Sequence, residues 1–201
     1  MPDSHIHIRS DGLSAEIDPL GAQLFALRDA DGADLLWNGD RAFWTGRAPV
    51  LFPIVGALAN DRYRLGEREF TLPKHGFARR RLFEVAEAAP GRAVFRLCWD
   101  EETLAVYPFR FELDLSFAVA GPTLTMTATV RNLDPAAPMA ASFGFHPALR
   151  WPLPYGQPRA AHALVFEYNE PAPDPSRQRR RPRPAGRRAD ASGGPHPRPA
   201  R

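Results

Sequence analysis

Several stretches within the first 170 residues of this chain alternate apolar and polar residues with a period of two. The clearest run, residues 107–119, has aromatic or aliphatic side chains at the odd positions from 109 and arginine, glutamate, aspartate and serine at the even positions from 110 to 116. A Gly-Pro turn follows, and residues 124–130 then alternate apolar side chains with threonines. Such alternation is typical of half-buried β-strands. The sequence therefore predicts an antiparallel hairpin from these two runs.

Shorter apolar runs predict further strands, separated by Gly- and Pro-containing turns at intervals typical of β-sandwiches. We expect these strands at residues 5–9, 13–17, 22–28, 34–37, 69–72, 82–86, 93–99, 140–146 and 163–167. Helical periodicity is almost absent from residues 1–170, so the predicted fold class is all-β. Residues 38–62 are irregular and rich in aromatic residues and proline, which favours a loop region that lines a pocket. Trp37, Phe43 and Trp44 could stack there on a sugar face, although core packing is the commoner use of such side chains.

The strand expected before Pro147 carries the candidate chemistry. Its alternation places Phe143 and Phe145 on the core face and His146 on the opposite face, beside Gly144. Proline has no N–H to donate to a neighbouring strand, so the strand should end before Pro147 and leave His146 at its C-terminal end. An imidazole in such a position suits proton transfer near neutral pH. The alternative is a strand-end histidine with a purely structural role.

The composition changes sharply after Glu170. Residues 171–201 hold eight prolines, nine arginines and two aspartates, a net charge of +7, so residues 1–170 carry −4 of the chain's +3. Such a segment cannot bury enough apolar surface to become ordered, and we expect a folded part over 1–170 and a disordered tail over 171–201. Electrostatic binding to nucleic acid and a linker or partner-binding arm are open interpretations of the tail. Its Arg/Pro/Ala/Gly bias favours a third, out-of-frame translation.

The composition also excludes several classes of protein. Cys98 is the single cysteine, which excludes an intramolecular disulfide and a metal site built from cysteines. No apolar run reaches the ~18 residues of a membrane span, and the N-terminus lacks the pattern of a signal peptide. The acidic body gives no basis for nucleic-acid binding. We therefore expect a soluble, cytoplasmic protein without nucleic-acid or membrane partners.

Five segments form an ordered set of motifs along the chain. They are residues 36–39 (Leu-Trp-Asn-Gly), 48–56 (Ala-Pro-Val-Leu-Phe-Pro-Ile-Val-Gly), 74–79 (Lys-His-Gly-Phe-Ala-Arg), 107–119, and 143–147 (Phe-Gly-Phe-His-Pro). In order and spacing, the set resembles the aldose 1-epimerase (galactose mutarotase-like) family, in its branch with a His-Gly-Phe-Ala-Arg motif, over roughly residues 5–173. The resemblance implies a galactose mutarotase-like β-sandwich that interconverts the α and β anomers of a hexose or hexose phosphate. It implies a small-molecule sugar or sugar phosphate as partner and no metal or nucleotide cofactor.

The resemblance also implies roles for four residues. Anomer exchange needs an acid at the ring oxygen and a base at the anomeric hydroxyl, and their roles reverse on ring closure. His146 matches the family's general acid, and His75 matches a second histidine that hydrogen-bonds the sugar and stabilises charge. Arg79 resembles a substrate contact able to hold a phosphate, and Arg47 is a further candidate of that kind. The structural alternatives are a turn-stabilising His75 and an Arg79 that belongs to a solvated run of arginines.

The family's general base is a glutamate in the C-terminal part of the sandwich, and here the pattern departs from the family. Residues 171–201 contain no glutamate, and Glu167 and Glu170 lie too early to match it. Ala57 stands where some relatives carry a polar or basic residue. We therefore expect a sandwich that is incomplete at its C-terminus, with impaired catalysis. A non-catalytic carbohydrate-binding remnant and a poorly folded fragment with uncovered strand edges are the alternatives.

Overall fold

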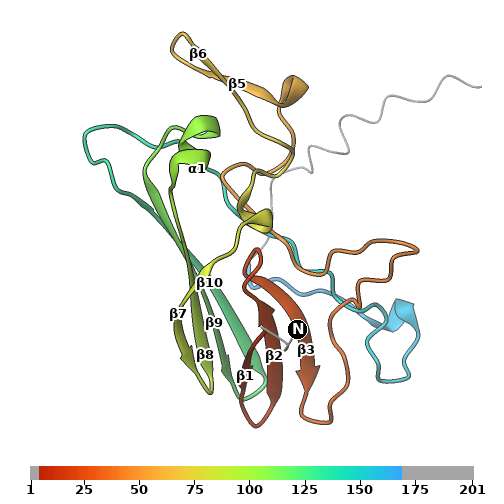
Figure 1. Cartoon of the computed structure of the whole chain (residues 1–201). Helices are drawn as coiled ribbons and strands as arrows, with labels where there is room; N and C mark the ends of the chain where they lie inside the picture. The colour runs from red at the N-terminus through yellow and green to blue at the C-terminus, as the bar shows by residue number, and fades with distance from the viewer. Residues whose placement is uncertain (1–4, 169–201) are drawn as a thin grey trace, which may run out of the picture. The chain divides into compact units, whose positions relative to one another are not determined.

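The computed structural model describes residues 5–168 (Figure 1). These residues fall into two units. The first unit ends at Ala163 and contains all of the described strands and helices. The described part of the second unit, residues 164–168, contains neither strand nor helix. The disordered tail predicted over 171–201 lies outside the described residues.

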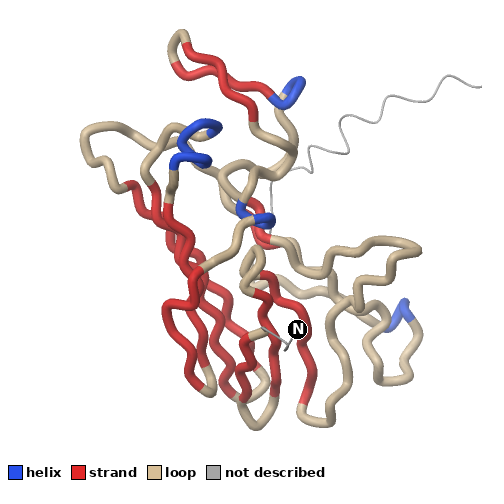
Figure 2. Tube along the Cα trace, in the orientation of Figure 1, coloured by secondary structure: helices blue, strands red, loops and turns tan. Residues whose placement is uncertain are grey.

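The first unit is built mainly from two antiparallel sheets (Figure 2). Three strands form the first sheet in the order of the chain, namely β1 (Ile6–Arg9), β2 (Leu13–Asp18) and β3 (Gln23–Asp29). Four strands form the second, namely β7 (Glu84–Ala89), β8 (Arg92–Cys98), β9 (Phe111–Ala120) and β10 (Thr123–Asn132). Their spatial order is β10-β9-β8-β7, a simple meander.

Shorter elements lie between these sheets in the chain. Two strand pairs are formed by β4 (Val50–Leu51) with β11 (Gly144–Phe145) and by β5 (Arg62–Leu65) with β6 (Arg68–Thr71). The helical elements are α1 (Glu101–Val106) and the 3₁₀ turns η1 (Ala59–Asp61), η2 (Ala78–Arg80) and η3 (Arg159–Ala161). Among residues 5–168, no helix is long and apolar enough to cross a membrane.

The all-β fold class and the predicted hairpin are confirmed. Strands β9 and β10 pair without a register shift from Phe111 opposite Asn132 to Ala120 opposite Thr123. The hairpin begins at Phe111 rather than at 107, because Phe109 N–H donates to the Tyr107 carbonyl (2.8 Å) in a turn that precedes the strand. The alternation therefore located the strand but not its first residue.

Three strand predictions were wrong or too long. Residues 34–37 form only isolated bridges, 140–146 contracts to β11, and 163–167 contains no strand. Alternation alone does not make a strand, because the backbone also needs partners along its length. Helix α1 was not predicted, since six residues are too few for helical periodicity to show, and strand β5 was not predicted either. A local signal for α1 existed in the capping box, where Asp100 accepts from Thr103 N–H (2.7 Å) and Thr103 Oγ1 accepts from Asp100 N–H (2.8 Å).

The hydrophobic core lies between the two sheets, where β1 and β2 contact β8 and β9. The inward side chains Leu113, Leu115 and Phe117 of β9 have no exposed surface, as the alternation predicted. The turn between β1 and β2 contacts the turn between β9 and β10, where Ser10 Oγ donates to the Gly121 carbonyl (2.8 Å). A Cβ atom on Gly12 would lie 2.6 Å from that carbonyl group, so the contact requires glycine.

The outer face of the four-stranded sheet is held by ion pairs across three strands. Asp114 of β9 is only 9% exposed, although its position in the alternation predicted an outward, solvated side chain. Arg96 of β8 donates to both of its carboxylate oxygens (2.7 and 2.8 Å), and Arg131 of β10 donates to one of them (2.8 Å). These hydrogen bonds lower the pKa of the Asp114 carboxyl. The side chain points outward, but the two guanidinium groups shield it from water.

Replacement of Leu115 by alanine tests the core. Because Leu115 has no exposed surface, we expect Leu115→Ala to lower the free energy of unfolding by about 2–5 kcal/mol. The exposed Thr125 of β10 provides the control, and Thr125→Ala should change stability by less than about 0.5 kcal/mol. Urea unfolding followed by tryptophan fluorescence measures both variants. Similar losses for the two, or a wild-type chain with no cooperative transition, would contradict a packed two-sheet core.

Candidate functional site

Three of the four candidate residues from the sequence line one pocket. This pocket, the histidine pocket, has a volume of about 280 Å³ and opens to solvent. Its lining residues are Trp44, Pro49, Leu51, Lys74, His75, Arg79 and His146. They come from three separate parts of the chain, and none of them is a carboxylate.

Strand β11 positions His146. Its two residues pair with β4, Gly144 opposite Leu51 and Phe145 opposite Val50. The Phe143 and Phe145 rings pack against the core with centroids 4.8 Å apart, so both aromatic side chains lie on the predicted face. His146 follows directly and is exposed, with its ring edge-on to Trp44 at 5.5 Å between centroids.

The loop that carries His75 is anchored by a close approach of two backbone segments. The Phe52 carbonyl, directly after β4, accepts hydrogen bonds from Phe77 N–H (3.0 Å) and Ala78 N–H (3.2 Å). Gly76 lies so close that a Cβ atom there would be 2.2 Å from the same carbonyl oxygen. Gly76 and His75 have φ of +68° and +67°, in the left-handed region that glycine adopts without strain. The Gly in the His-Gly-Phe-Ala-Arg motif is therefore required by the backbone.

One hydrogen bond orients the His75 ring, and a second holds its backbone. Gly56 N–H donates to Nδ1 of His75 (3.0 Å), and His75 N–H donates to the Gly56 carbonyl (2.8 Å). An accepting Nδ1 carries no proton, so the neutral ring carries its proton on Nε2. The imidazole is thereby set as a donor through Nε2–H.

The electrostatic surroundings of His75 favour its neutral form. Burial is the largest cause that lowers the pKa of His75, and the positive charges of Arg79, Lys74 and His146 lower it further. Protonation of Nδ1 would also break the hydrogen bond from Gly56. At neutral pH, His75 is therefore a hydrogen-bond donor and not a cation.

Arg79 lies on the 3₁₀ turn η2, where it borders a second hollow. Its Nη2 donates to the Lys74 carbonyl (2.9 Å), and its buried Nε has no hydrogen-bond partner among the described residues. The adjoining hollow has a volume of about 210 Å³ and shares Trp44, Pro49 and Arg79 with the histidine pocket. Its other lining residues are Gln23, Thr45, Gly46 and Arg80. The two hollows together place three cationic side chains beside the histidines.

Arg47 is engaged elsewhere. Its Nη1 donates to the Phe25 carbonyl (2.8 Å), and its guanidinium lies 3.9 Å from the centroid of the Phe25 ring. These contacts attach the loop after Trp44 to strand β3. Arg47 is absent from the lining of the histidine pocket.

Two further residues line the histidine pocket, Lys74 and Trp44, and the sequence analysis assigned neither of them firmly to the site. Lys74 had no assigned role, although it directly precedes His75 in the motif and is the only lysine of the chain. Trp44 was a candidate for stacking but was expected in the core, and it is 39% exposed at the pocket. Among residues 5–168, no group of three or more His, Cys, Asp or Glu side chains is placed to hold a metal ion.

A pH titration of the histidine ring signals by NMR tests the state of His75. We expect its midpoint to lie below the usual value of about 6.5, and Arg79→Met should raise it because a neighbouring positive charge is removed. Arg47→Met is the control and should leave the midpoint unchanged, since that guanidinium lies over Phe25. The unfolded chain takes up this proton at a higher pH than the folded one, so the stability due to His75 should decrease as pH falls below about 6.5. A midpoint at or above 6.5 would contradict this description.

Comparison with known proteins agrees with the fold and the motifs. The family model for aldose 1-epimerase matches residues 4–189. The plasmid-encoded protein LacX of Lactococcus lactis subsp. lactis is 34% identical over 166 residues, which cover 80% of this chain and 56% of LacX. The chain thus spans little more than half the length of that relative.

Two solved structures show the same architecture. The galactose mutarotase related enzyme from Lactobacillus acidophilus superposes with a TM-score of 0.73 at 32% identity, covering 76% of this chain and 51% of that one. The galactose mutarotase-like protein from Lactobacillus casei gives 0.71 at 34% identity, covering 74% and 50%. The fold is therefore the galactose mutarotase-like β-sandwich. Because the family model spans most of the sequence and the relatives share its two-sheet architecture, the chain belongs to the aldose 1-epimerase family.

Proposed function

We propose that the histidine pocket binds a hexose or hexose phosphate and exchanges its α and β anomers. The observation that carries the proposal is the convergence of His75, His146 and Arg79 on one open pocket, from parts of the chain that are far apart in sequence. Membership of the aldose 1-epimerase family supports the reaction type.

In the proposed reaction, His146 acts as the general acid. Its imidazolium donates a proton to the ring oxygen while a base takes the proton of the anomeric hydroxyl, and the bond between C1 and the ring oxygen breaks. Rotation about C1–C2 in the open aldehyde turns the other face toward the hydroxyl, and closure reverses both proton transfers. The exposed position of His146 at the end of β11 gives its ring access to a bound sugar.

His75 has a different proposed role, because its Nδ1 already accepts from Gly56. Its Nε2–H donates to a sugar oxygen and stabilises the negative charge that develops there during ring opening. Lys74 and Arg79 add positive charge at the same pocket without the need to transfer a proton. The two histidines thus divide proton transfer from charge stabilisation.

The proposed reaction needs a general base to take the anomeric proton, and the described lining of the histidine pocket supplies none with a carboxylate. We therefore propose that this chain accelerates anomer exchange only weakly, with solvent or buffer as the proton acceptor. The same observation favours a second candidate function, the binding of a sugar without turnover.

Exchange spectroscopy of glucose and galactose anomers tests the catalytic proposal. We expect the folded chain to accelerate exchange above buffer, and His146→Ala to abolish that acceleration, since loss of a general acid costs about 10²-fold or more. His7→Ala is a matched control, because His7 is exposed on β1 outside the histidine pocket. Added formate should increase the wild-type rate if a carboxylate base is what the pocket lacks. No acceleration by a folded sample, with or without formate, would contradict catalysis and leave the binding candidate.

A binding titration tests whether the ligand is phosphorylated. We expect Arg79→Met to weaken hexose 6-phosphate binding about tenfold more than hexose binding, because a charge-assisted hydrogen bond to the phosphate is lost. Arg47→Met should affect neither ligand, since its guanidinium is engaged at Phe25. The fluorescence of Trp44, at the pocket, provides the signal. Equal weakening for both sugars would contradict a phosphate contact by Arg79.

A further inference from the structure

Gln23, the first residue of β3, holds a loop that borders the histidine pocket. Its side-chain Oε1 accepts hydrogen bonds from Arg47 N–H (3.1 Å) and Ala48 N–H (3.1 Å). In a side-chain amide only the carbonyl oxygen can accept from two N–H groups, so these bonds also fix the orientation of the amide. One polar side chain thus attaches two consecutive backbone groups of the loop to the three-stranded sheet.

The loop held by Gln23 carries Trp44, which lines the histidine pocket. The Trp44 indole lies against Gly46, so closely that no Cβ atom could be accommodated there. The Trp44 carbonyl accepts a hydrogen bond from Trp37 Nε1 (2.8 Å). The position of the indole therefore follows the backbone of this loop.

The same loop is hydrogen-bonded to the segment that follows His146. The Arg47 carbonyl accepts from Ala148 N–H (2.8 Å), two residues beyond His146. The His146 ring in turn lies edge-on to the Trp44 ring. Through one loop, Gln23 is connected to both rings.

The turn before Gln23 contacts the 3₁₀ turn that carries Arg79. Gly21 N–H donates to the Arg81 carbonyl (2.8 Å), directly after η2. Gly21 has a φ of +76°, and a Cβ atom there would lie 2.8 Å from the Arg79 carbonyl oxygen, so this approach requires glycine. The chain from β2 to β3 thus contacts the Arg79 turn through its backbone and the Trp44 loop through the Gln23 side chain.

We infer that Gln23 is a positioning residue for the proposed anomer exchange, because its Oε1 holds the loop that sets Trp44 against His146. Its effect on the reaction rests on the proposed function, whereas its effect on the two rings does not. Ala48 is only 2% exposed, so its N–H cannot turn to water if Oε1 is removed. A buried donor without a partner is costly, and the loop must then shift to satisfy it.

Three substitutions separate positioning from a general loss of structure. Gln23→Met removes the acceptor but keeps a side chain of similar length. Gln23→Glu restores the acceptor, since one carboxylate oxygen can accept from both N–H groups, and the adjoining hollow contains Arg79 and Arg80 but no carboxylate. Gln157→Met makes the same chemical change at an exposed glutamine outside both hollows and is the matched control.

NMR of the full chain measures the pocket without any sugar. We expect nuclear Overhauser contacts between the ring protons of Trp44 and His146 in the wild type, in Gln23→Glu and in Gln157→Met, and their loss in Gln23→Met. Circular dichroism establishes that the variants are equally folded. Gln23→Asn, whose amide is one methylene too short to reach the loop, should lose the same contacts while it keeps a polar side chain.

Anomer exchange measures the consequence for the reaction. We expect Gln23→Met to lower kcat/KM for glucose by roughly tenfold to a hundredfold, because the acid and the ligand are no longer aligned, and Gln23→Glu to restore it. Gln157→Met should exchange at the wild-type rate.

Two sets of outcomes distinguish this inference from the proposed function. Ring contacts that persist in both Gln23→Met and Gln23→Asn, or that Gln23→Glu does not restore, would overturn the positioning role. An unchanged exchange rate in Gln23→Met would overturn its part in the reaction. A wild-type chain that shows the contacts but neither binds nor exchanges a hexose would instead contradict the proposed function, and the effect of Gln23 on the two rings would still be measured.

Discussion

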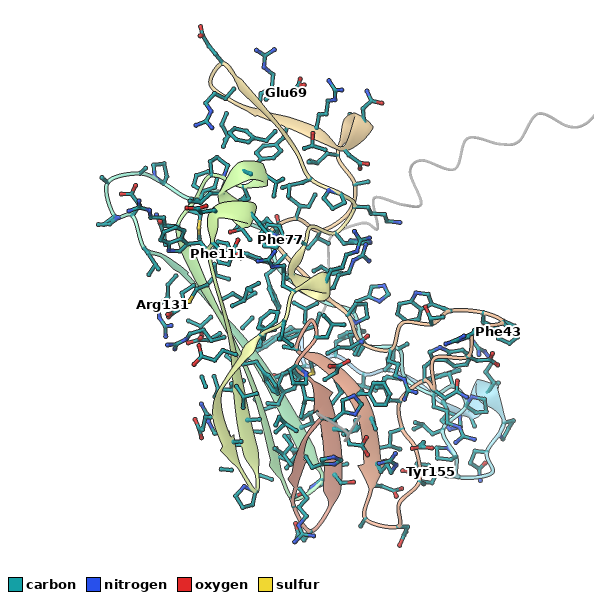
Figure 3. The ribbon with its side chains drawn as sticks, in the orientation of Figure 1. Phe43, Glu69, Phe77, Phe111, Arg131 and Tyr155 are labelled. Atoms are coloured by element: carbon teal, nitrogen blue, oxygen red, sulfur yellow. The ribbon has the colours of Figure 1, made fainter. Side chains whose placement is uncertain are left out.

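The backbone carbonyl of Phe52 connects the core of this protein to its candidate site. The Phe52 ring is fully buried, and its centroid lies 5.1 Å from that of Phe111 and 6.2 Å from that of Phe77. Phe77 and Phe111, labelled in Figure 3, have ring centroids 5.9 Å apart. The Phe52 carbonyl accepts two hydrogen bonds from the loop that follows His75, and a Cβ atom on Gly76 would lie 2.2 Å from the carbonyl oxygen. A side chain at Gly76 cannot be accommodated, because backbone and not a flexible side chain occupies the space. The position of the His75 loop thus depends on packing in the core.

The same constraint brings the two histidines to one pocket. Strand β4 ends at Leu51, directly before Phe52, and pairs with β11, which ends directly before His146. His75 and His146 are thus attached to the same two-residue strand, one through a carbonyl and one through a strand pair. Because the attachments are made by backbone atoms, the site is supported by rigid elements even though the pocket is lined from loops.

The charges around the pocket agree with a divided role for the histidines. His75 is held neutral by burial and by neighbouring cations, with its Nδ1 occupied by Gly56. His146 is exposed, and no hydrogen bond from another described residue fixes one of its ring nitrogens as an acceptor, as Gly56 does for His75. The cations Lys74, Arg79 and Arg80 suit an oxyanion or phosphate, whereas no described lining residue suits the removal of a proton from a hydroxyl. Under the proposed function, the pocket would therefore be better equipped to bind a sugar and stabilise charge than to complete both proton transfers.

The sequence by itself determined the elements whose information is local. Period-two alternation is enough to locate β9 and β10, and Pro147 is enough to place His146 at a strand end, because both effects act within a few residues. Only the tertiary structure decided where the long side chains go. Arg47 and Arg79 look alike in sequence, yet one guanidinium lies on the Phe25 ring and the other at the pocket. Asp114 has an outward position in the alternation, yet arginines of two neighbouring strands cover it. These outcomes depend on strands and loops that meet only when the chain is folded, and no local pattern of residues carries that information.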